Sequence, residues 1–576
     1  MNNKNYLVLA AFLAASTAYT FGQNMIDGVR FGSTDISGTA RYRSMAGAFG
    51  ALGGDISCMS DNPAGLGIFR GTNSITITPH LGFSSTETLG TEKATGKDNN
   101  FSVSNFGAVF SYMPDNDGAL VNFNIGFSIE RRLQSFRKMN MILDTPTGSF
   151  GEYLYEQANS YLDDYDMKAE YLGTQSAWND YNVPVLSLMG YESYALDIAE
   201  GDPNHVDNPI FDHTYQQSNM RERTRHDYYN ISGAFNFGDV LYAGLTIRIS
   251  DFNSMIEHCF SEDSQRYDPH ATSHGDYITY DNRVETKGSG IGVNFGVLWK
   301  PTEAWRLGAA VHTPVYMDMK EFNDASMEAY NIMYEQALAQ NPDLANWSEW
   351  NDKTTYSYST PWEYQFSTAY VFGGRAIASL EYDLRDFKSM RFRRAHDGTY
   401  IDKLYFEDMN KTQKPHLKMQ HTFKAGFEYR ITPQLSARVG YAYKSSPYNR
   451  NARLTKVCYG HLEEDPIKDL LDRLPEIDIN WPENLQPCDD PSHLHPQDIS
   501  FLYRTATKPN YTTLDDQHYI TGGLGWRGKS WSIDLACVSH HISEYYSAYP
   551  CDYSDSDILD FNTHQLNWDL TFGYRF

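Results

Sequence analysis

Large apolar residues alternate with polar or small ones over many segments of the chain. The last segment shows this most clearly: every second residue from Leu566 to Phe576 is large and apolar, and Asn567, Asp569 and Arg575 lie between them. A period of two gives a β-strand one apolar and one polar face. Charged side chains would be costly in a packed core but are ordinary when they face the wet lumen of a barrel. The pattern therefore predicts strands with lipid on one side and water on the other.

About fourteen segments alternate in this way, and each is close to the roughly 9–11 residues that a tilted strand needs to cross a bilayer. They begin near residues 74, 101, 119, 227, 240, 288, 304, 361, 374, 419, 434, 517, 530 and 564. We therefore predict an all-β fold, a transmembrane antiparallel β-barrel of about 14 strands that occupies residues 74–576.

The connections between these segments alternate in length. Short turns are expected at Pro114–Gly118, Gly238–Asp239, Lys300–Glu303, Gly373–Gly374, Ile431–Pro433 and Arg527–Lys529. Long polar loops are expected near residues 132–226, 254–287, 318–360, 389–418, 446–516 and 543–563. Transmembrane barrels have short periplasmic turns and long outer loops, whereas a soluble β-sandwich has no reason to alternate so strictly. The connections thus favour a barrel independently of the strands.

The N-terminus has the features of a secretory signal peptide. Lys4 precedes an apolar run from Tyr6 to Ala15, and small residues follow this run. The run is too short to cross a bilayer as a stable helix. We therefore predict a cleaved signal peptide over residues 1–23 and a mature chain in the outer membrane of a Gram-negative envelope. The chain ends on alternating aromatic residues that resemble the assembly signal of outer-membrane barrels, namely Phe572, Tyr574 and Phe576.

Composition and motifs narrow the function further. The formal net charge of -26 argues against nucleic acid as a partner, because phosphates are neutralised by clustered Lys and Arg. The mean hydropathy of -0.54 is low for a helical membrane protein but is expected for a barrel. Because no Gly-x-Ser-x-Gly, His-Glu-x-x-His or phosphate-binding motif occurs, we expect neither an enzyme nor a cofactor. His540 and His541 would point to opposite faces of a strand, so we expect no metal there either.

Residues 24–73 precede the first strand and do not have the pattern of a strand pair. The run Arg43–Gly54 is rich in Gly and Ala, and an Asn-Pro-Ala sequence follows within Asp61–Gly67. A segment this short cannot form a core of its own. Its small residues would let it pack closely against the wall of a barrel from the inside.

With these features the chain resembles the FadL-type outer-membrane transport family, whose members import long-chain fatty acids and other hydrophobic compounds. The resemblance is carried by Asn62–Leu66 with the Gly-rich run before it, by Gly308–Pro314, and by Arg438–Tyr443 with Ser446–Pro447. It implies that residues 24–73 form a hatch inside the barrel and that ligands pass without energy input. It gives a hatch or ligand-binding role to Asn62, Pro63, Ala64, Gly65, Leu66, Phe49 and Leu52.

In this family the ligand leaves sideways through a gap beside a kinked strand. Gly126 lies at a lumen position of the third predicted strand, where it either permits such a kink or only makes room for the hatch. The outer loops near 132–226 and 446–516 are longer than those of the family, so fatty-acid specificity does not carry over.

The resemblance thus implies a passive channel for hydrophobic small molecules, such as long-chain fatty acids. We expect a monomer, with outer-membrane lipids, lipopolysaccharide and the barrel assembly machinery as its other partners. The alternative is a surface receptor or adhesin whose large loops bind a host ligand or haem.

Two features of the predicted outer loops bear on these functions. A helical pattern over Asp324–Gln340 predicts a helix that either collects apolar ligands or simply packs on its neighbours. Exported proteins can form disulfides, and the candidate pairs are Cys458–Cys488, which share one loop, and Cys537–Cys551, which flank another.

Overall fold

The structure is a computed structural model of the chain. It describes residues 25–576 except 116–117, 145, 147, 181–182, 209–214, 265–275, 343, 397–402, 404–405, 408, 412–413, 450–510 and 548–557. The predicted signal peptide over residues 1–23 lies outside the described residues and stays a prediction.

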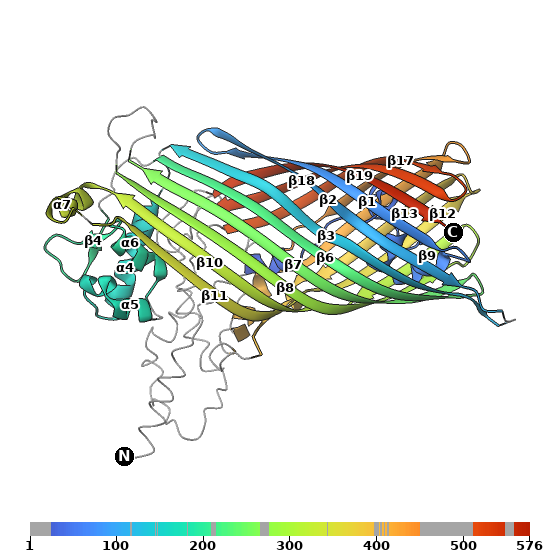
Figure 1. Ribbon diagram of the computed structural model, residues 1–576, viewed down its shortest axis with the longest axis horizontal. Helices are drawn as coiled ribbons and strands as arrows, with labels where there is room; N and C mark the ends of the chain where they lie inside the picture. Colours follow the sequence, from blue (N-terminus) through green and yellow to red (C-terminus); the bar gives the residue numbers. More distant parts are fainter. Residues whose placement is uncertain are drawn as a thin grey trace, which may run out of the picture.

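One antiparallel sheet forms the wall of the molecule. In the described part of the chain it contains 17 strands, and the first, β1, pairs with the last, β19. The strands are β1 Ser74–Leu89, β2 Lys93–Tyr112, β3 Leu120–Asp144, β6 Tyr215–Phe237, β7 Leu241–Asp263, β8 Tyr277–Trp299, β9 Trp305–His312, β10 Tyr316–Tyr330, β11 Trp347–Ser359, β12 Trp362–Phe372, β13 Ala376–Asp386, β14 Arg391–Arg394, β15 Met419–Arg430, β16 Leu435–Lys444, β17 Tyr511–Arg527, β18 Trp531–Ser547 and β19 Ile558–Arg575. Because β9–β10, β11–β12 and β13–β14 are each one strand with a break, the sheet closes as a barrel of 14 strands (Figure 1). The predicted fold class and strand number are confirmed.

Alternation along each strand places apolar side chains outside the barrel and polar ones inside. On β7, Leu245 and Ile247 are exposed, whereas Thr246 and Arg248 are buried. Trp299 lies at one edge of this exposed apolar band, where β8 ends. An outward apolar band with aromatic residues at its edges is typical of outer-membrane barrels. We therefore identify it as the surface that faces lipid.

The two ends of the barrel differ, as the connections predicted. The six expected short turns all join strands at the end where the C-terminus lies (Figure 1). At the other end the strands run much further than the expected membrane crossing, because β3 has 25 residues and β6 has 23. Pairing continues without interruption to Tyr215↔Asp263 and Asp263↔Tyr277. The wall therefore rises well beyond the apolar band.

A group of short helices, which we name the cap, closes the long-loop end (Figure 1). Its elements are α4 Phe150–Asp164, η3 Ala169–Gly173, α5 Gln175–Asn179, α6 Val185–Glu192, β4 Asp197–Ile198 and β5 Val206–Asp207. Apolar side chains of the cap, such as Phe150 and Leu188, form one core with inward-facing strand residues such as Phe260 and Tyr280. The cap thus fills the mouth of the barrel.

The helix predicted over Asp324–Gln340 is wrong in its first half. Strand β10 continues to Tyr330, and only α7, Ile332–Gln340, is helical, with the Asn331 side chain accepting a hydrogen bond from the backbone N–H of Tyr334. Met327 faces inward into the cap core as a strand residue. Pairing of β10 with both β8 and β11 outweighs the local helical pattern. Within the described ranges, no helix is long and apolar enough to cross a bilayer.

Residues 25–73 lie inside the barrel and are mostly buried. They form four short helices: α2 Met25–Gly32, α3 Ala40–Arg43, η1 Ile56–Met59 and η2 Pro63–Ile68. Two further short helices, η4 Phe387–Ser389 and η5 Lys414–His416, lie next to strands of the wall. The backbone N–H of Ala40 donates to Thr571 on β19 (2.7 Å), and that of Gly50 donates to Glu381 on β13 (2.7 Å). The segment is therefore bonded to widely separated parts of the wall.

Candidate functional site

The Asn-Pro-Ala turn fixes the N-terminal segment against the wall. Asn62 caps η2 and donates its side-chain amide to the carbonyl oxygens of Gly50 (2.7 Å) and Val297 (3.1 Å). Pro63 is the first residue of η2, where a missing N–H costs nothing. A β-carbon at Gly244 on β7 would meet the Pro63 backbone, so glycine there permits the close approach.

The other residues singled out from the sequence pack around this turn. Gly65 lies against Cys58, and Leu66 packs with Met59 in one buried cluster. Phe49 and Leu52 belong to a second cluster. The structure thus brings Asn62, Pro63, Ala64, Gly65, Leu66, Phe49 and Leu52 into the lumen, where they anchor the segment. Their role in ligand binding stays a prediction.

A separate apolar cluster lies between α2 and the wall, nearer the long-loop end, and we name it the apolar compartment. It comprises Val29, Phe31, Phe252, Val315, Met317, Met319, Tyr356, Tyr358, Phe387, Met390, Phe392, Phe406, Met409, Leu417 and Tyr448. The Phe31 ring is central, with its centroid 5.1 Å from that of Phe252 and 5.6 Å from that of Tyr358. Methionine and aromatic side chains dominate this enclosed apolar volume.

The compartment forms where three neighbouring strands break. The breaks lie between β9 and β10, between β11 and β12, and between β13 and β14. Pro314 and Pro361 occupy the first two, and proline cannot donate to the strand ladder. The Tyr358 hydroxyl donates to the Gly28 carbonyl (2.7 Å), and a β-carbon on Gly28 would lie 2.8 Å from Met390. Helix α2 thus packs closely against the part of the wall where the strands break.

Little empty space remains beside α2. A cavity of about 80 Å³ lies between α2 and the wall, and its lining combines apolar residues such as Val29 and Leu514 with charged ones such as Arg137, Glu222 and Lys444. This space suits a few water molecules rather than a large ligand. A larger molecule would need α2 or the flexible methionine side chains to shift.

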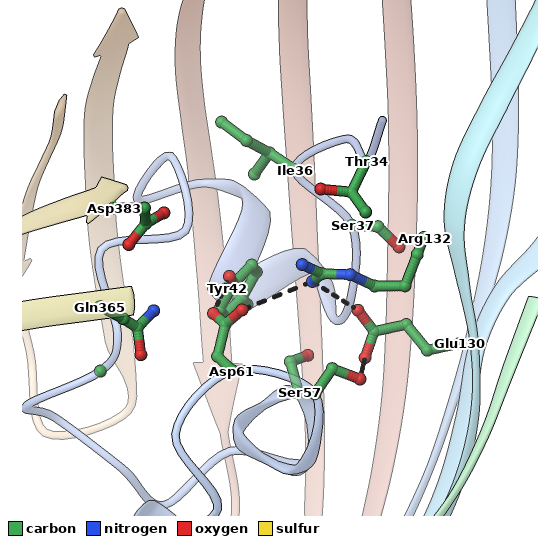
Figure 2. Close-up of polar contacts among 12 residues, drawn as sticks. Thr34, Ile36, Ser37, Tyr42, Ser57, Asp61, Glu130, Arg132, Gln365 and Asp383 are labelled. Carbon is green, nitrogen blue, oxygen red and sulfur yellow. Dashed lines mark hydrogen bonds and ion pairs between the residues drawn. The ribbon is translucent and has the colours of Figure 1, made fainter. Parts of the chain in front are cut away.

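Buried ion pairs connect the N-terminal segment to the wall below the compartment. The Arg132 guanidinium on β3 lies 3.2 Å from Glu130 and 3.5 Å from Asp61 of the segment (Figure 2). The Ser60 hydroxyl donates to Glu130 (2.7 Å), and the Tyr42 hydroxyl donates to Asp61. Burial, together with the Asp61 charge, raises the pKa of Tyr42 well above its usual value, so the phenol keeps its proton.

Two more buried cations, Arg385 and Lys424, extend these ion pairs around the lumen into what we name the ionic layer. Arg385 contacts Glu363 at 2.6 Å, and Lys424 contacts both Glu381 and Asp383 at 2.7 Å. Burying charges is costly, and removing one partner leaves the other unpaired. The layer therefore separates the apolar compartment from the short-turn half of the lumen.

The seam between β2 and β3 is only half paired. Backbone pairing runs from Tyr112↔Phe123 to Asn105↔Glu130 and stops there, although both strands continue. Beyond that point the strands stay close without backbone pairing: the Asn140 amide donates to the Thr95 carbonyl (3.3 Å), and a β-carbon on Gly96 would lie 2.1 Å from the Lys138 carbonyl oxygen. The β2–β3 seam therefore lacks a backbone ladder in its outer half.

The register of β3 with β6 shifts near Leu120 and again at Arg132, where the pairing with β2 ends, and not at Gly126. Pairing with β2 and β6 is regular across Gly126, whereas the register with β6 shifts between Arg131 and Leu133. A β-carbon on Gly126 would lie 2.6 Å from Met59, so this glycine makes room for the N-terminal segment. Arg132 lies at this register shift, and its side chain points inward to Asp61. The shift therefore serves to direct the Arg132 guanidinium into the lumen.

The remaining expectations concern cysteines, metals and the carboxyl end. Cys458, Cys488 and Cys551 lie outside the described residues, so the pairs Cys458–Cys488 and Cys537–Cys551 stay predictions. Among the described residues, no group of His, Cys, Asp or Glu is arranged to hold a metal. Phe572, Tyr574 and Phe576 are exposed on the apolar band, and their role as an assembly signal also stays a prediction.

Comparison with known proteins places this geometry in a known fold. Neither a protein-family model nor a curated protein matches the chain by sequence. Among solved structures, a FadL homologue from Pseudomonas aeruginosa is similar at 13% identity, with a TM-score of 0.52 over 94% of this chain and 99% of that chain. The toluene transporter TodX from P. putida is similar at 11% identity, with a TM-score of 0.48 over 94% and 99%. The first likeness shows that the chain has the FadL-type fold expected from the resemblance, whereas the second is too weak to support an argument.

Proposed function

We propose that the protein is a passive outer-membrane channel for hydrophobic small molecules, with residues 24–73 as its hatch and residues 74–576 as its barrel. The apolar compartment is the observation that carries this proposal, because a channel for polar solutes needs no enclosed apolar cluster inside a lumen that is otherwise lined by polar side chains. Methionine side chains adapt to ligands of different shape. Because Val29 and Phe31 belong to α2, movement of this helix would open the compartment to a ligand.

The exit in this proposal is the outer half of the β2–β3 seam. An apolar ligand would meet an unfavourable barrier at the ionic layer of Arg132, Arg385 and Lys424, so passage straight through the lumen is disfavoured. The backbone ladder between β2 and β3 ends at Glu130, close to the same layer. A ligand that leaves sideways there would enter lipid without crossing the ionic layer, and would pass the buried cluster of Arg137 with Glu222 and Glu544 on the inner side of β3.

The compartment can be tested by ligand retention. The protein purified in mild detergent is incubated with a panel of hydrophobic compounds and analysed by native mass spectrometry. In the double variant Met317→Gln, Met319→Gln, we expect retention to fall by roughly tenfold, because buried amides without partners disfavour an apolar ligand. The matched control is Met45→Gln, Met59→Gln, in buried clusters away from the compartment. Failure of the intact protein to retain any compound, or an equal loss in both variants, would contradict the proposal.

The cap supports a second candidate function, that of a receptor or adhesin. It has a folded core and exposes carboxylates that include Glu152, Glu156, Asp163 and Glu170. Neutralising these four residues to Gln or Asn separates the two functions. A receptor should lose binding to its cationic partner on cells, whereas a channel should keep its uptake of hydrophobic compounds.

A further inference from the structure

Three cations lie in one row across the outward face of the wall. Arg225 on β6 is opposite Asn253 on β7, which is opposite Lys287 on β8, and Lys287 is opposite Lys320 on β10. The row ends on Thr355 of β11. We name Arg225, Lys287 and Lys320 the basic row, and no carboxylate interrupts it between β6 and β11.

The depth of the basic row follows from the apolar band. Ile249, Ile291 and Tyr316 form the last apolar row and are 46%, 54% and 58% exposed. The basic row lies four residues further along these strands, for example Ile291 to Lys287. At about 3.4 Å per residue and a tilt of about 45°, this is about 10 Å above the hydrocarbon edge. The cations are therefore at the depth of lipid headgroups.

The side chains of the basic row are available to a ligand. Lys320 is exposed and forms no ion pair with any residue that the structure describes. Lys287 contacts Glu285 (2.7 Å) while half exposed, and Arg225 is 3.7 Å from the exposed Asp251 and 4.0 Å from Asp227, which Arg131 also contacts. Exposed pairs of this kind are weak and easily exchanged.

An outward aromatic ring holds a further lysine beside the row. The ammonium of Lys287 lies 5.9 Å from the centroid of Phe322, and that of Lys353 lies 5.6 Å from the same ring. Contacts of a cation with an aromatic ring are favourable and keep both lysines extended along the wall. Phe322 thus holds the ammonium groups of Lys287 and Lys353 close enough together to bind one anionic group.

We propose that the basic row, with Lys353, binds the phosphorylated headgroup of a glycolipid in the outer leaflet. The chain as a whole has a formal net charge of -26, whereas this row holds three cations and no carboxylate; Asp227, Asp251 and Asp318 lie one outward row nearer the apolar band. Lysine binds phosphate as a point charge and arginine as a bidentate donor. This surface lies outside the lumen, so the proposal does not depend on which compound the channel carries.

Native mass spectrometry and gel filtration of the protein in mild detergent would test this proposal. The probe is a bisphosphorylated lipid A glycolipid, and the comparison probes are its dephosphorylated form, phosphatidylglycerol and inorganic phosphate. The test variant is Lys287→Gln, Lys320→Gln, Lys353→Gln. The matched control removes three exposed lysines of the cap and outer loops, Lys168→Gln, Lys411→Gln and Lys414→Gln.

We expect each lysine of the site to contribute about fivefold to affinity, so the triple variant should bind the phosphorylated glycolipid about a hundredfold more weakly. The control should change by less than twofold. If the triple variant does not fold, the single variant Lys320→Gln should lose about fivefold and Lys320→Arg should restore binding.

Three results would overturn the proposal. One is unchanged glycolipid affinity in the folded triple or single variant. Another is equal binding of the dephosphorylated glycolipid or of phosphatidylglycerol. The third is displacement of the glycolipid by inorganic phosphate at similar concentration, which would show a free-phosphate site instead.

Discussion

At the scale of single residues, the Asn62–Leu66 turn and the Arg132 guanidinium hold the N-terminal segment against the wall. The Asn62–Leu66 turn stands in one stretch of sequence, and the structure places it in the lumen as the resemblance implied. The apolar compartment draws Phe31, Met319 and Phe392 from elements far apart in the chain. Only the prolines Pro314 and Pro361, inside otherwise strand-like segments, signalled that the wall breaks there. Arg132 gave no local sign of its role, because its partner Asp61 is remote in sequence.

Removing the Arg132 guanidinium should destabilise the folded barrel. In Arg132→Ala, Glu130 and Asp61 would stay buried without their cation, which costs about 3–5 kcal/mol. The matched control is Arg70→Ala, whose ion pair with Asp239 is exposed and should be worth at most about 1 kcal/mol. Reversible unfolding in urea from lipid vesicles measures both. Equal stability of the two variants would show that the buried pair does not hold the segment.

At the scale of elements, the membrane-crossing part of each strand was predictable, and its extension was not. Apolar alternation marks only the stretch that faces lipid, so β6 and β7 were expected to end near the headgroups. Their outer halves carry polar residues on the outward face and pair all the same, as Arg221↔Glu257 shows. The prediction of a helix over Asp324–Gln340 was partly wrong for the same reason. The spacing of Met327 and Tyr330 does not reveal that this stretch pairs with β8 on one side and β11 on the other.

Closing the outer half of the β2–β3 seam should slow ligand release. In a chain whose six cysteines are replaced by serine, Thr95→Cys and Asn140→Cys place thiols across the unpaired seam. The control pair, Thr279→Cys with Glu328→Cys, joins opposite residues of the continuous β8–β10 ladder. Oxidation should block uptake of a hydrophobic compound into vesicles in the first variant, and reduction should restore it. Unchanged uptake after complete cross-linking would exclude this seam as the exit.

At the scale of the whole molecule, the barrel is closed along its axis. The N-terminal segment occupies the lumen and the cap fills the mouth. The intact protein in a planar bilayer should therefore show no ion conductance above background, because water and ions lack a continuous path. A general porin studied in the same bilayer is the control, and it should open in steps. Stepwise opening of this protein in the absence of ligand would favour a polar pore.

The height of the wall above the membrane determines which part of the protein is reached first from outside the cell. From Tyr229, near the edge of the apolar band, β6 continues outward to Tyr215. At about 3.4 Å per residue and a tilt of about 45°, the rim stands about 30 Å above the hydrocarbon. The cap lies at that end of the barrel, away from the C-terminus (Figure 1). Antibodies or bacteriophages that approach an intact cell should therefore encounter the cap before the wall below it.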